Sequence, residues 1–209
     1  LCSVVIALAL FGVVLTYYSS VRVLGDASSA LNMTALIGVA NQLDPNVLKL
    51  AFIFMLVGYG TKVGLVPMHT WLPDAYSEAP APIAAMLAGV LETVAVYTVL
   101  RSKALVDQAL PPEFTGNLLL TFGLLSFIVA SLFILIQHNY KRLFAYSSIE
   151  HMGLAMIGFG VGGMIGTFGG LFHLLNHAVA KALAFFVAGN IHRRFDTLEI
   201  DRVRGLARA

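Results

Sequence analysis

One stretch of the chain contains no charged residue over a length that can cross a bilayer: NLLLTFGLLSFIVASLFILIQ, residues 117–137. A transmembrane helix needs about 20 predominantly apolar residues. Further stretches of similar length and character lie on both sides of it, at residues 2–20, 48–68, 82–101, 144–162 and 166–191. The sequence therefore predicts an all-α, polytopic membrane helix bundle with about six transmembrane helices.

The composition of the whole chain supports this class. Of the 209 residues, 58% are hydrophobic and only 11% are charged, and the mean hydropathy is +0.84. A soluble domain carries about 25% charged residues, and disorder requires low hydrophobicity, so both classes are excluded. A net charge of +2 offers no basic surface for nucleic acid. The single cysteine excludes an internal disulfide and a cysteine metal site.

The segments between these stretches predict the connections. Residues 21–47 are mixed in character and predict a surface loop with a small helix. Residues 67–82 hold four of the seven prolines and predict a rigid, ordered loop at the membrane face. Glycines crowd residues 158–170, where we expect a tight turn and close helix packing. We expect one transmembrane domain over residues 1–209, with 192–209 a charged cytoplasmic segment after the last helix.

The basic residues predict the orientation of the chain. If the spans alternate in direction, one side of the membrane receives seven basic residues and the other receives four. Cytoplasmic loops carry the excess of lysine and arginine. We therefore place in the cytoplasm the side with Lys141, Arg142, Arg193, Arg194, Arg202, Arg204 and Arg208, and opposite it Arg22, Lys49, Arg101 and Lys103.

Two predicted spans contain an ionisable residue far from their ends. Such a group costs about 2.5–3.5 kcal/mol at the centre of a transmembrane helix, so it usually marks a pathway or a pair. Lys62 lies among glycines and shortly before Pro67, which predicts a broken helix. The alternative is a lysine that extends to the nearer membrane face. Glu92 lies in mid-span, and its alternative is a neutral, hydrogen-bonded glutamic acid.

The last predicted span carries His173, His177 and Lys181 at the spacing i, i+4, i+8. Each step drifts by only about 40° around a helix, so the three side chains form one polar stripe on an apolar helix. A stripe of this kind faces protein or water, and its groups can pass protons in succession. The alternatives are a metal bound by the two histidines, and core histidines beside an ion-paired lysine.

Glu150 and His151 form a further candidate group, with Ser147 on the same helix face. Their alternative is a solvated group at the cytoplasmic start of a helix. Buried titratable residues therefore occur in at least three predicted spans, and no nucleophile–base pair accompanies them. This pattern is typical of a proton or cation path and not of hydrolytic chemistry, so we expect no catalytic centre in the chain.

Three runs of sequence resemble a known family in the same order along the chain. They are KVGLVPMHTWLPDAYSEAP at 62–80, KRLFAYSSIEHMG at 141–153 and FHLLNHAVAKAL at 172–183. The family comprises the antiporter-like, proton-translocating membrane subunits of complex I, of group 4 hydrogenases and of multisubunit cation/proton antiporters. The run with Glu150 and His151 is most similar to hydrogenase-4 component F, the formate-hydrogenlyase type.

The resemblance implies a fourteen-helix fold with two inverted five-helix repeats, of which this chain is a fragment holding helices six to eleven. Lys62 matches the lysine at the family's broken helix, and His173, His177 and Lys181 match its histidine–histidine–lysine stripe. Many relatives carry a lysine near Glu92, so a lysine-to-lysine relay is in question at this point. The glutamate that pairs with Lys62 would precede Leu1, and the second broken helix would follow Ala209.

The family implies a subunit that translocates protons, or alternatively Na⁺, within a respiratory-type oxidoreductase in a bacterial or archaeal cytoplasmic membrane. The expected pathway residues are Lys62, Glu92, His173, His177 and Lys181, followed by Glu150 and His151. We expect no cofactor in this subunit, with nickel–iron and iron–sulfur clusters, or flavin and quinone, on partner subunits. The alternatives are a secondary cation/proton antiporter subunit and a non-conducting membrane scaffold.

Overall fold

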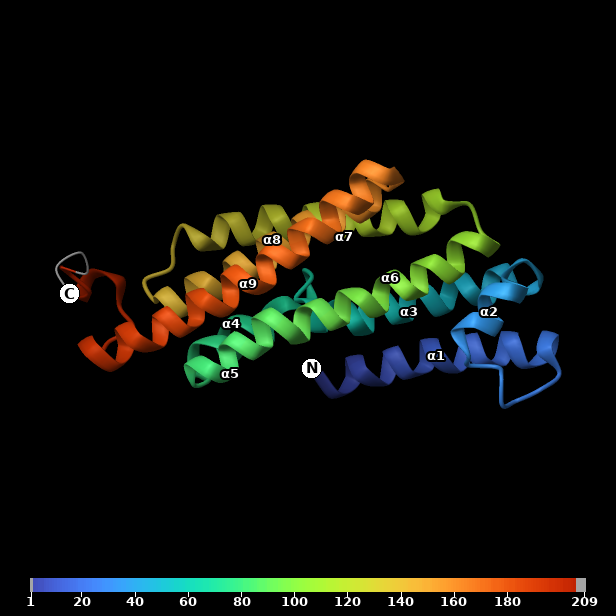
Figure 1. The fold of residues 1–209 in the computed structure, drawn as a ribbon, viewed down its shortest axis with the longest axis horizontal. Coiled ribbons are helices and arrows are strands. Elements are labelled where there is room, and N and C mark those ends of the chain that lie inside the picture. Colours follow the sequence, from blue (N-terminus) through green and yellow to red (C-terminus); the bar gives the residue numbers. More distant parts are fainter. Residues whose placement is uncertain (1, 206–209) are drawn as a thin grey trace.

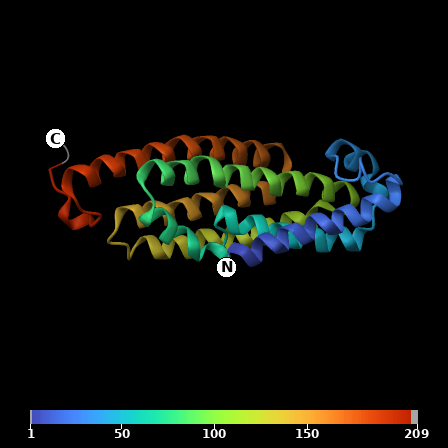
Figure 2. The same cartoon turned by 90° about the horizontal axis from the view of Figure 1, so that it is seen from below.

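The computed structural model describes residues 2–205 and consists of helices that run side by side along its longest axis (Figures 1 and 2). The long ones are α1 (Cys2–Leu24), α3 (Pro45–Val63), α6 (Glu92–Ala109), α7 (Pro112–Ile134), α8 (Tyr140–Val161) and α9 (Gly163–Phe195). The short ones are α2 (Met33–Val39), α4 (Trp71–Glu78) and α5 (Ala81–Met86). Over the described residues, the only β pairing is an isolated bridge between Asn139 and Glu199. The predicted all-α bundle is confirmed.

Five helical stretches are long and apolar enough to cross a membrane: Ser3–Leu24, Pro45–Glu78, Ala81–Ala109, Pro112–Ile134 and Gly163–Phe195. They include all of the predicted spans except 144–162. That stretch is helical as α8, which carries Glu150 and His151 in its middle, and it does not belong to these five. The last helix also continues to Phe195, beyond the predicted end at residue 191.

The helix that contains Lys62 is broken, as the sequence predicts. α3 ends at Val63, and Gly64 follows with φ 88°, a left-handed conformation that glycine adopts without strain. The chain then turns through Leu65–Pro67 and a short 3₁₀ turn before α4 begins at Trp71. The buried hydroxyl of Ser126, on α7, donates a hydrogen bond back to its own helix and accepts one from the Val66 N–H at 2.9 Å. A backbone donor freed by the break is thereby satisfied.

The prediction of a proline-rich loop over residues 67–82 is wrong, since most of this segment is helical. Pro73 is the third residue of α4 and Pro82 the second of α5. The first four N–H groups of a helix have no partner within it, so proline is tolerated there. The prolines therefore start two short helices instead of preventing them.

α5 and α6 form one continuous helical rod with a defect in its middle. Residues Leu87–Leu91 form a π-helical turn, and the N–H of Glu92 bonds to the carbonyl of Leu87. Single π turns inside α-helices are rare and often occur at functional sites. Nothing in the sequence predicted this turn.

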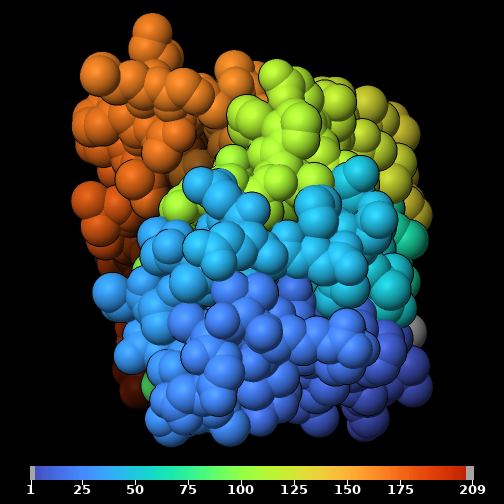
Figure 3. Space-filling view, turned by 90° about the vertical axis from the view of Figure 1, so that its right-hand side faces the viewer, coloured from blue at the N-terminus to red at the C-terminus, as the bar shows by residue number. Residues whose placement is uncertain are grey.

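The connections at one end of the bundle agree with the predictions for them. The segment 25–44, which contains α2, forms much of the surface that Figure 3 shows, next to the first residues of α3. At Gly162, φ 68° and ψ −154° allow the tight turn from α8 into α9. Beyond the turn, α8 and α9 approach so closely that a Cβ atom on Gly158 would lie 3.1 Å from the carbonyl oxygen of Gly166. The predicted close packing of the glycines is confirmed.

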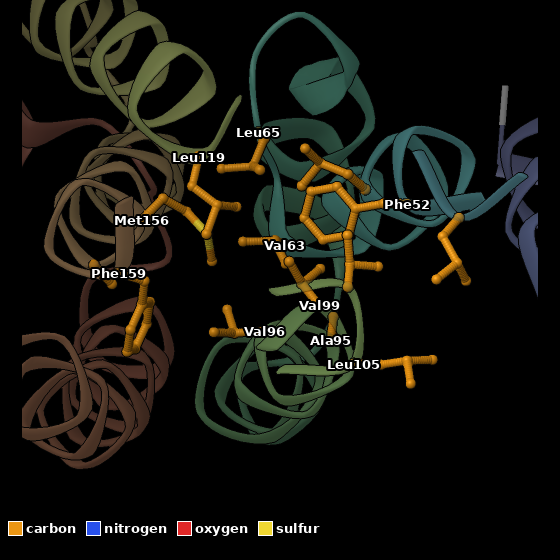
Figure 4. Packing of buried hydrophobic residues seen from close by; sticks show 14 of the residues in the cluster. Phe52, Val63, Leu65, Ala95, Val96, Val99, Leu105, Leu119, Met156 and Phe159 are labelled. Carbon is orange, nitrogen blue, oxygen red and sulfur yellow. The ribbon is translucent and has the colours of Figure 1, made fainter. Parts of the chain in front are cut away.

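The apolar core divides into two clusters on either side of the break. The first joins α3, α6, α7 and α8, and Figure 4 shows its packing around Phe52, Val96, Leu119, Met156 and Phe159. The second lies between α4, α5, α8 and α9, and its buried members include Leu72, Tyr76, Ala85, Ile149 and Phe185. The second cluster surrounds most of the polar residues described next.

Candidate functional site

Three of the predicted pathway residues meet inside the bundle. Glu92 is the first residue of α6, and His177 and Lys181 lie one turn apart on the inner face of α9. Their exposed fractions are only 0%, 4% and 7%. α9 packs against both α5 and the π turn that precedes Glu92. The structure therefore buries an acid, an imidazole and an amine in the interior of the bundle.

The two oxygens of the Glu92 carboxyl have different surroundings. Oε1 accepts a hydrogen bond of 2.5 Å from the hydroxyl of Tyr76. Oε2 lies 3.8 Å from Nε2 of His177 and has no hydrogen-bond partner among the described residues. Both nitrogens of His177 also lack a partner there. A buried polar group without a partner is costly, so these atoms mark a position where a proton or water would be bound.

A row of histidines continues from His177. Its ring centroid lies 5.8 Å from that of His151 on α8, and Nδ1 of His151 lies 3.2 Å from Nε2 of His173 on α9. His173 borders a groove of about 270 Å³ between α8 and α9, whose walls are mainly glycines and apolar side chains. The row therefore leads from the buried Glu92 to the side of the bundle.

Lys181 lies on the other side of His177 along α9. Its ammonium donates a 3.3 Å hydrogen bond to the carbonyl of Phe144 and lies 5.9 Å from the centre of that aromatic ring. The amine of Lys181 therefore lies against α8 at the Phe144 carbonyl, one helical turn from His177.

Glu150 lies on α8, one residue before His151, and is half-buried. Its Oε1 accepts a hydrogen bond of 2.9 Å from the hydroxyl of Ser131 on α7. The structure therefore places Glu150 and His151 at the interior of the bundle, next to the stripe on α9, and not at a solvated start of a helix.

Lys62 is separate from this cluster. It is half-buried at the end of α3, and its ammonium lies 5.3 Å from the centre of the Trp71 ring. Within residues 2–205, no hydrogen bond or ion pair joins Lys62 to Glu92. The indole of Trp71 donates a 2.7 Å hydrogen bond to the carbonyl of Thr61 near the end of α3, which also accepts a 3.2 Å hydrogen bond from the Gly64 N–H. Trp71 therefore connects the start of α4 to the end of α3 beside Lys62.

The polar partners that hold these groups were not predicted from the sequence. Tyr76 and Ser131 bind the two carboxyls, yet a single tyrosine or serine in an apolar helix gives no distinctive signal. A prediction of a helix over residues 71–78, in place of a loop, would have made a buried position for Tyr76 easier to infer. Over the described part of the chain, no three His, Cys, Asp or Glu side chains are grouped as metal ligands.

The chain matches one protein-family model over residues 2–209, that of the NADH:quinone oxidoreductase/Mrp antiporter transmembrane family. It is 45% identical over 201 residues to a hydrogenase-4 component F homolog of Methylacidiphilum infernorum (isolate V4), covering 96% of this chain and 42% of that protein. It is 39% identical over 157 residues to NAD(P)H-quinone oxidoreductase chain 4 of Prochlorococcus marinus (strain MIT 9312), covering 75% of this chain and 29% of that one. The chain thus spans less than half the length of these relatives.

Solved structures give the same result. A chain of the archaeal membrane-bound sulfane sulfur reductase superposes with a TM-score of 0.88 at 30% identity, over 99% of this chain and 41% of that one. A chain of respiratory complex I from Thermus thermophilus superposes with a TM-score of 0.68 at 31% identity, over 91% of this chain and 38% of that one. A chain of the Mrp complex from Dietzia sp. DQ12-45-1b shares the fold, with a TM-score of 0.74 at 23% identity, over 90% of this chain and 34% of that one. The chain therefore belongs to the NADH:quinone oxidoreductase/Mrp antiporter transmembrane family, the antiporter-like membrane subunits that its three sequence runs resemble.

Proposed function

We propose that this chain is the ion-conducting part of a membrane subunit that translocates protons in a respiratory-type oxidoreductase complex. The observation that carries the proposal is the buried group of Glu92, His177 and Lys181, in which Oε2 of Glu92 and Nε2 of His177 face each other without hydrogen-bond partners among the described residues. Holding ionisable groups in a membrane helix costs several kcal/mol in total, at about 2.5–3.5 kcal/mol for each charged one. A merely structural role would be served better by apolar side chains.

The chemistry of the row favours H⁺ over Na⁺. Imidazole and amine groups accept protons but do not suit a hard metal cation, which prefers several oxygen ligands. The only side-chain hydrogen-bond partner of the Glu92 carboxyl in the described chain is the phenol of Tyr76. Protons would pass between Glu92, His177 and Lys181, with His151, His173 and Glu150 extending the route. Lys62 would act at the break, apart from this row.

The proposal places the redox chemistry on other subunits. The relatives are named as a hydrogenase-4 component and as a chain of NAD(P)H-quinone oxidoreductase. By analogy, partner subunits would carry nickel–iron and iron–sulfur clusters, or flavin and quinone, and this chain would carry no cofactor. The location would be a bacterial or archaeal cytoplasmic membrane, with the α4–α5 connection and the tail after α9 on the cytoplasmic side.

The test is Lys181→Ala in the full-length subunit of the purified complex, reconstituted into vesicles. Electron transfer continues but proton translocation falls at least tenfold, because the buried amine one turn from His177 is lost. Lys49→Ala is the matched control, since Lys49 is exposed at the start of α3. Unchanged proton movement per electron in Lys181→Ala would refute the relay.

The second candidate function is a secondary cation/proton antiporter without redox partners, and the match to an Mrp antiporter family model favours it. Mass spectrometry of the same native complex distinguishes the two functions. Redox subunits with bound metal or flavin support the oxidoreductase. A complex composed solely of membrane subunits, with cation-dependent proton exchange, supports the antiporter.

A further inference from the structure

Tyr76 is the residue that joins the broken helix to the buried acid. It lies on α4, the helix that follows the break, and its side chain is completely buried. Its hydroxyl donates the 2.5 Å hydrogen bond to Oε1 of Glu92, which is equally buried on α6. No other hydrogen bond reaches the Glu92 side chain from the described residues. The position of this carboxyl therefore depends on one phenol.

The ring of Tyr76 is fixed from two directions. Trp71 packs edge-on against it with ring centroids 6.4 Å apart, and Phe185 of α9 does so at 5.4 Å. Edge-to-face contacts at such distances are favourable and directional. The ring therefore moves only together with α4 or α9.

Trp71 also contacts the other side of the break. Its indole N–H bonds to the carbonyl of Thr61, and the Lys62 ammonium lies over its ring. A cation over an indole face is attracted by the ring's electrons, most strongly where water is excluded. A physical chain of contacts thus runs from Lys62 through Trp71 and Tyr76 to Glu92.

This series of contacts ends at the Glu92 carboxyl, whose second oxygen is not bound by Tyr76. With Oε1 held by Tyr76, Oε2 faces His177 at 3.8 Å, slightly too far for a hydrogen bond. The π turn at Leu87–Leu91 also helps to direct the Glu92 carboxyl toward His177, because its i→i−5 hydrogen bond sets the position of Glu92, the first residue of α6. A small displacement of the carboxyl would either close or widen the gap to His177.

We propose that Tyr76 is a positioning residue, which aims the Glu92 carboxyl at His177 and transmits the state of the break around Lys62 to it. A shift of α4 relative to α3 moves the phenol, and the phenol moves the carboxyl. The inference rests on the proposed function, since it gives Tyr76 a role in proton transfer between Glu92 and His177. It assigns no proton transfer to Tyr76 itself.

The experiment compares Tyr76→Phe with wild type in the full-length subunit of the intact complex. Phenylalanine keeps both edge contacts and removes only the hydroxyl. Tyr146→Phe is the matched control, because Tyr146 is buried in the same apolar cluster and its hydroxyl makes no hydrogen bond within residues 2–205. Two readouts are taken: proton translocation per electron, and the infrared carboxyl band that Glu92→Gln removes.

We expect Tyr76→Phe to shift the Glu92 band to higher wavenumber and to slow translocation about tenfold, the change expected for one hydrogen bond to an ionisable group. Tyr146→Phe leaves both readouts unchanged. A general loss of packing would instead slow translocation without shifting the Glu92 band.

Two results would overturn the inference, and they differ. If Glu92→Gln stops translocation but Tyr76→Phe changes neither the band nor the rate, the positioning role fails and the proposed function stands. If Glu92→Gln itself leaves translocation unchanged, the proposed function fails at Glu92 and the inference fails with it.

Discussion

At the scale of single residues, Lys141 shows how a charge can serve structure without belonging to the pathway. Its side chain is buried, and its ammonium donates two 2.7 Å hydrogen bonds, to the carbonyls of Ser77 and Ala79. These carbonyls lie at the end of α4, where a helix has no internal partners for them. From the sequence, Lys141 indicates only the orientation of the chain in the membrane. Lys141 in fact fastens α8 to the end of α4.

We predict that Lys141→Gln destabilises the complex by about 1–3 kcal/mol, because it leaves at least one buried carbonyl unsatisfied. Arg142→Gln is the control. Arg142 pairs with Asp74 at 2.9 Å, but the two side chains are 40% and 68% exposed, and solvent-exposed pairs contribute about 0–1 kcal/mol. Thermal unfolding of the purified complex measures the difference. Equal losses in the two variants would show that the buried hydrogen bonds of Lys141 are unimportant.

Residue spacing predicted the part of the site that lies on one helix, but not the contacts between helices. The interval of four between His173, His177 and Lys181 fixes one helix face, whatever surrounds that helix. The partner of Glu92 depends instead on how α4 packs against α6, which no local pattern encodes. Tyr76 was therefore not predicted as a site residue, although its hydroxyl makes the shortest hydrogen bond to the Glu92 carboxyl.

At the scale of helices, contact between α7 and α8 depends on two glycines that face each other. A Cβ atom on Gly153 would lie 2.8 Å from the carbonyl oxygen of Gly123 and 2.8 Å from the backbone nitrogen of Phe127. Backbone atoms cannot move aside as a flexible side chain can, so the helices would have to separate. Small residues permit such close approach in membranes, where packing and not water exclusion drives association.

We predict that Gly153→Ala lowers the stability of the assembled subunit by about 1–3 kcal/mol through overpacking. Gly169→Ala on α9 is the matched control, since nothing lies within 4 Å of the position that its Cβ would take. Alanine favours a helix over glycine by about 1 kcal/mol, so this variant is neutral or slightly stabilising. Yield and thermal stability of the complex measure both. A destabilised Gly169→Ala beside an unaffected Gly153→Ala would contradict this account.

Helix existence was predictable here, whereas helix defects were only partly so. Long apolar runs dictate spans because lipid offers no partner for backbone groups. The break after Lys62 left a signal in the glycines and in Pro67, but the prolines that follow were misread as a loop because they start helices. The π turn before Glu92 left no distinctive signal, since its one glycine, Gly89, is of a kind common in transmembrane helices and tertiary packing sets the geometry of the turn.

At the scale of the whole molecule, the polar groups form two regions joined by aromatic contacts. One is Lys62 at the break, and the other is the row of Glu92, His177 and Lys181 with the residues of α8. Sequence alone indicated a path but not this division, because the distance between spans cannot be read from the chain. The family membership agrees with the arrangement, and the chain covers 42% of one relative and 29% of another.

The central claim is that protons pass through the Glu92 carboxyl. The most direct measurement is the number of protons moved per electron by the reconstituted complex with Glu92→Gln, which keeps the shape and hydrogen-bonding capacity of the side chain but cannot ionise. Glu78→Gln is the control, because Glu78 is exposed at the end of α4. We expect Glu92→Gln to lower the ratio at least tenfold and Glu78→Gln to preserve it. A Glu92→Gln complex that pumps at the wild-type ratio would contradict the account.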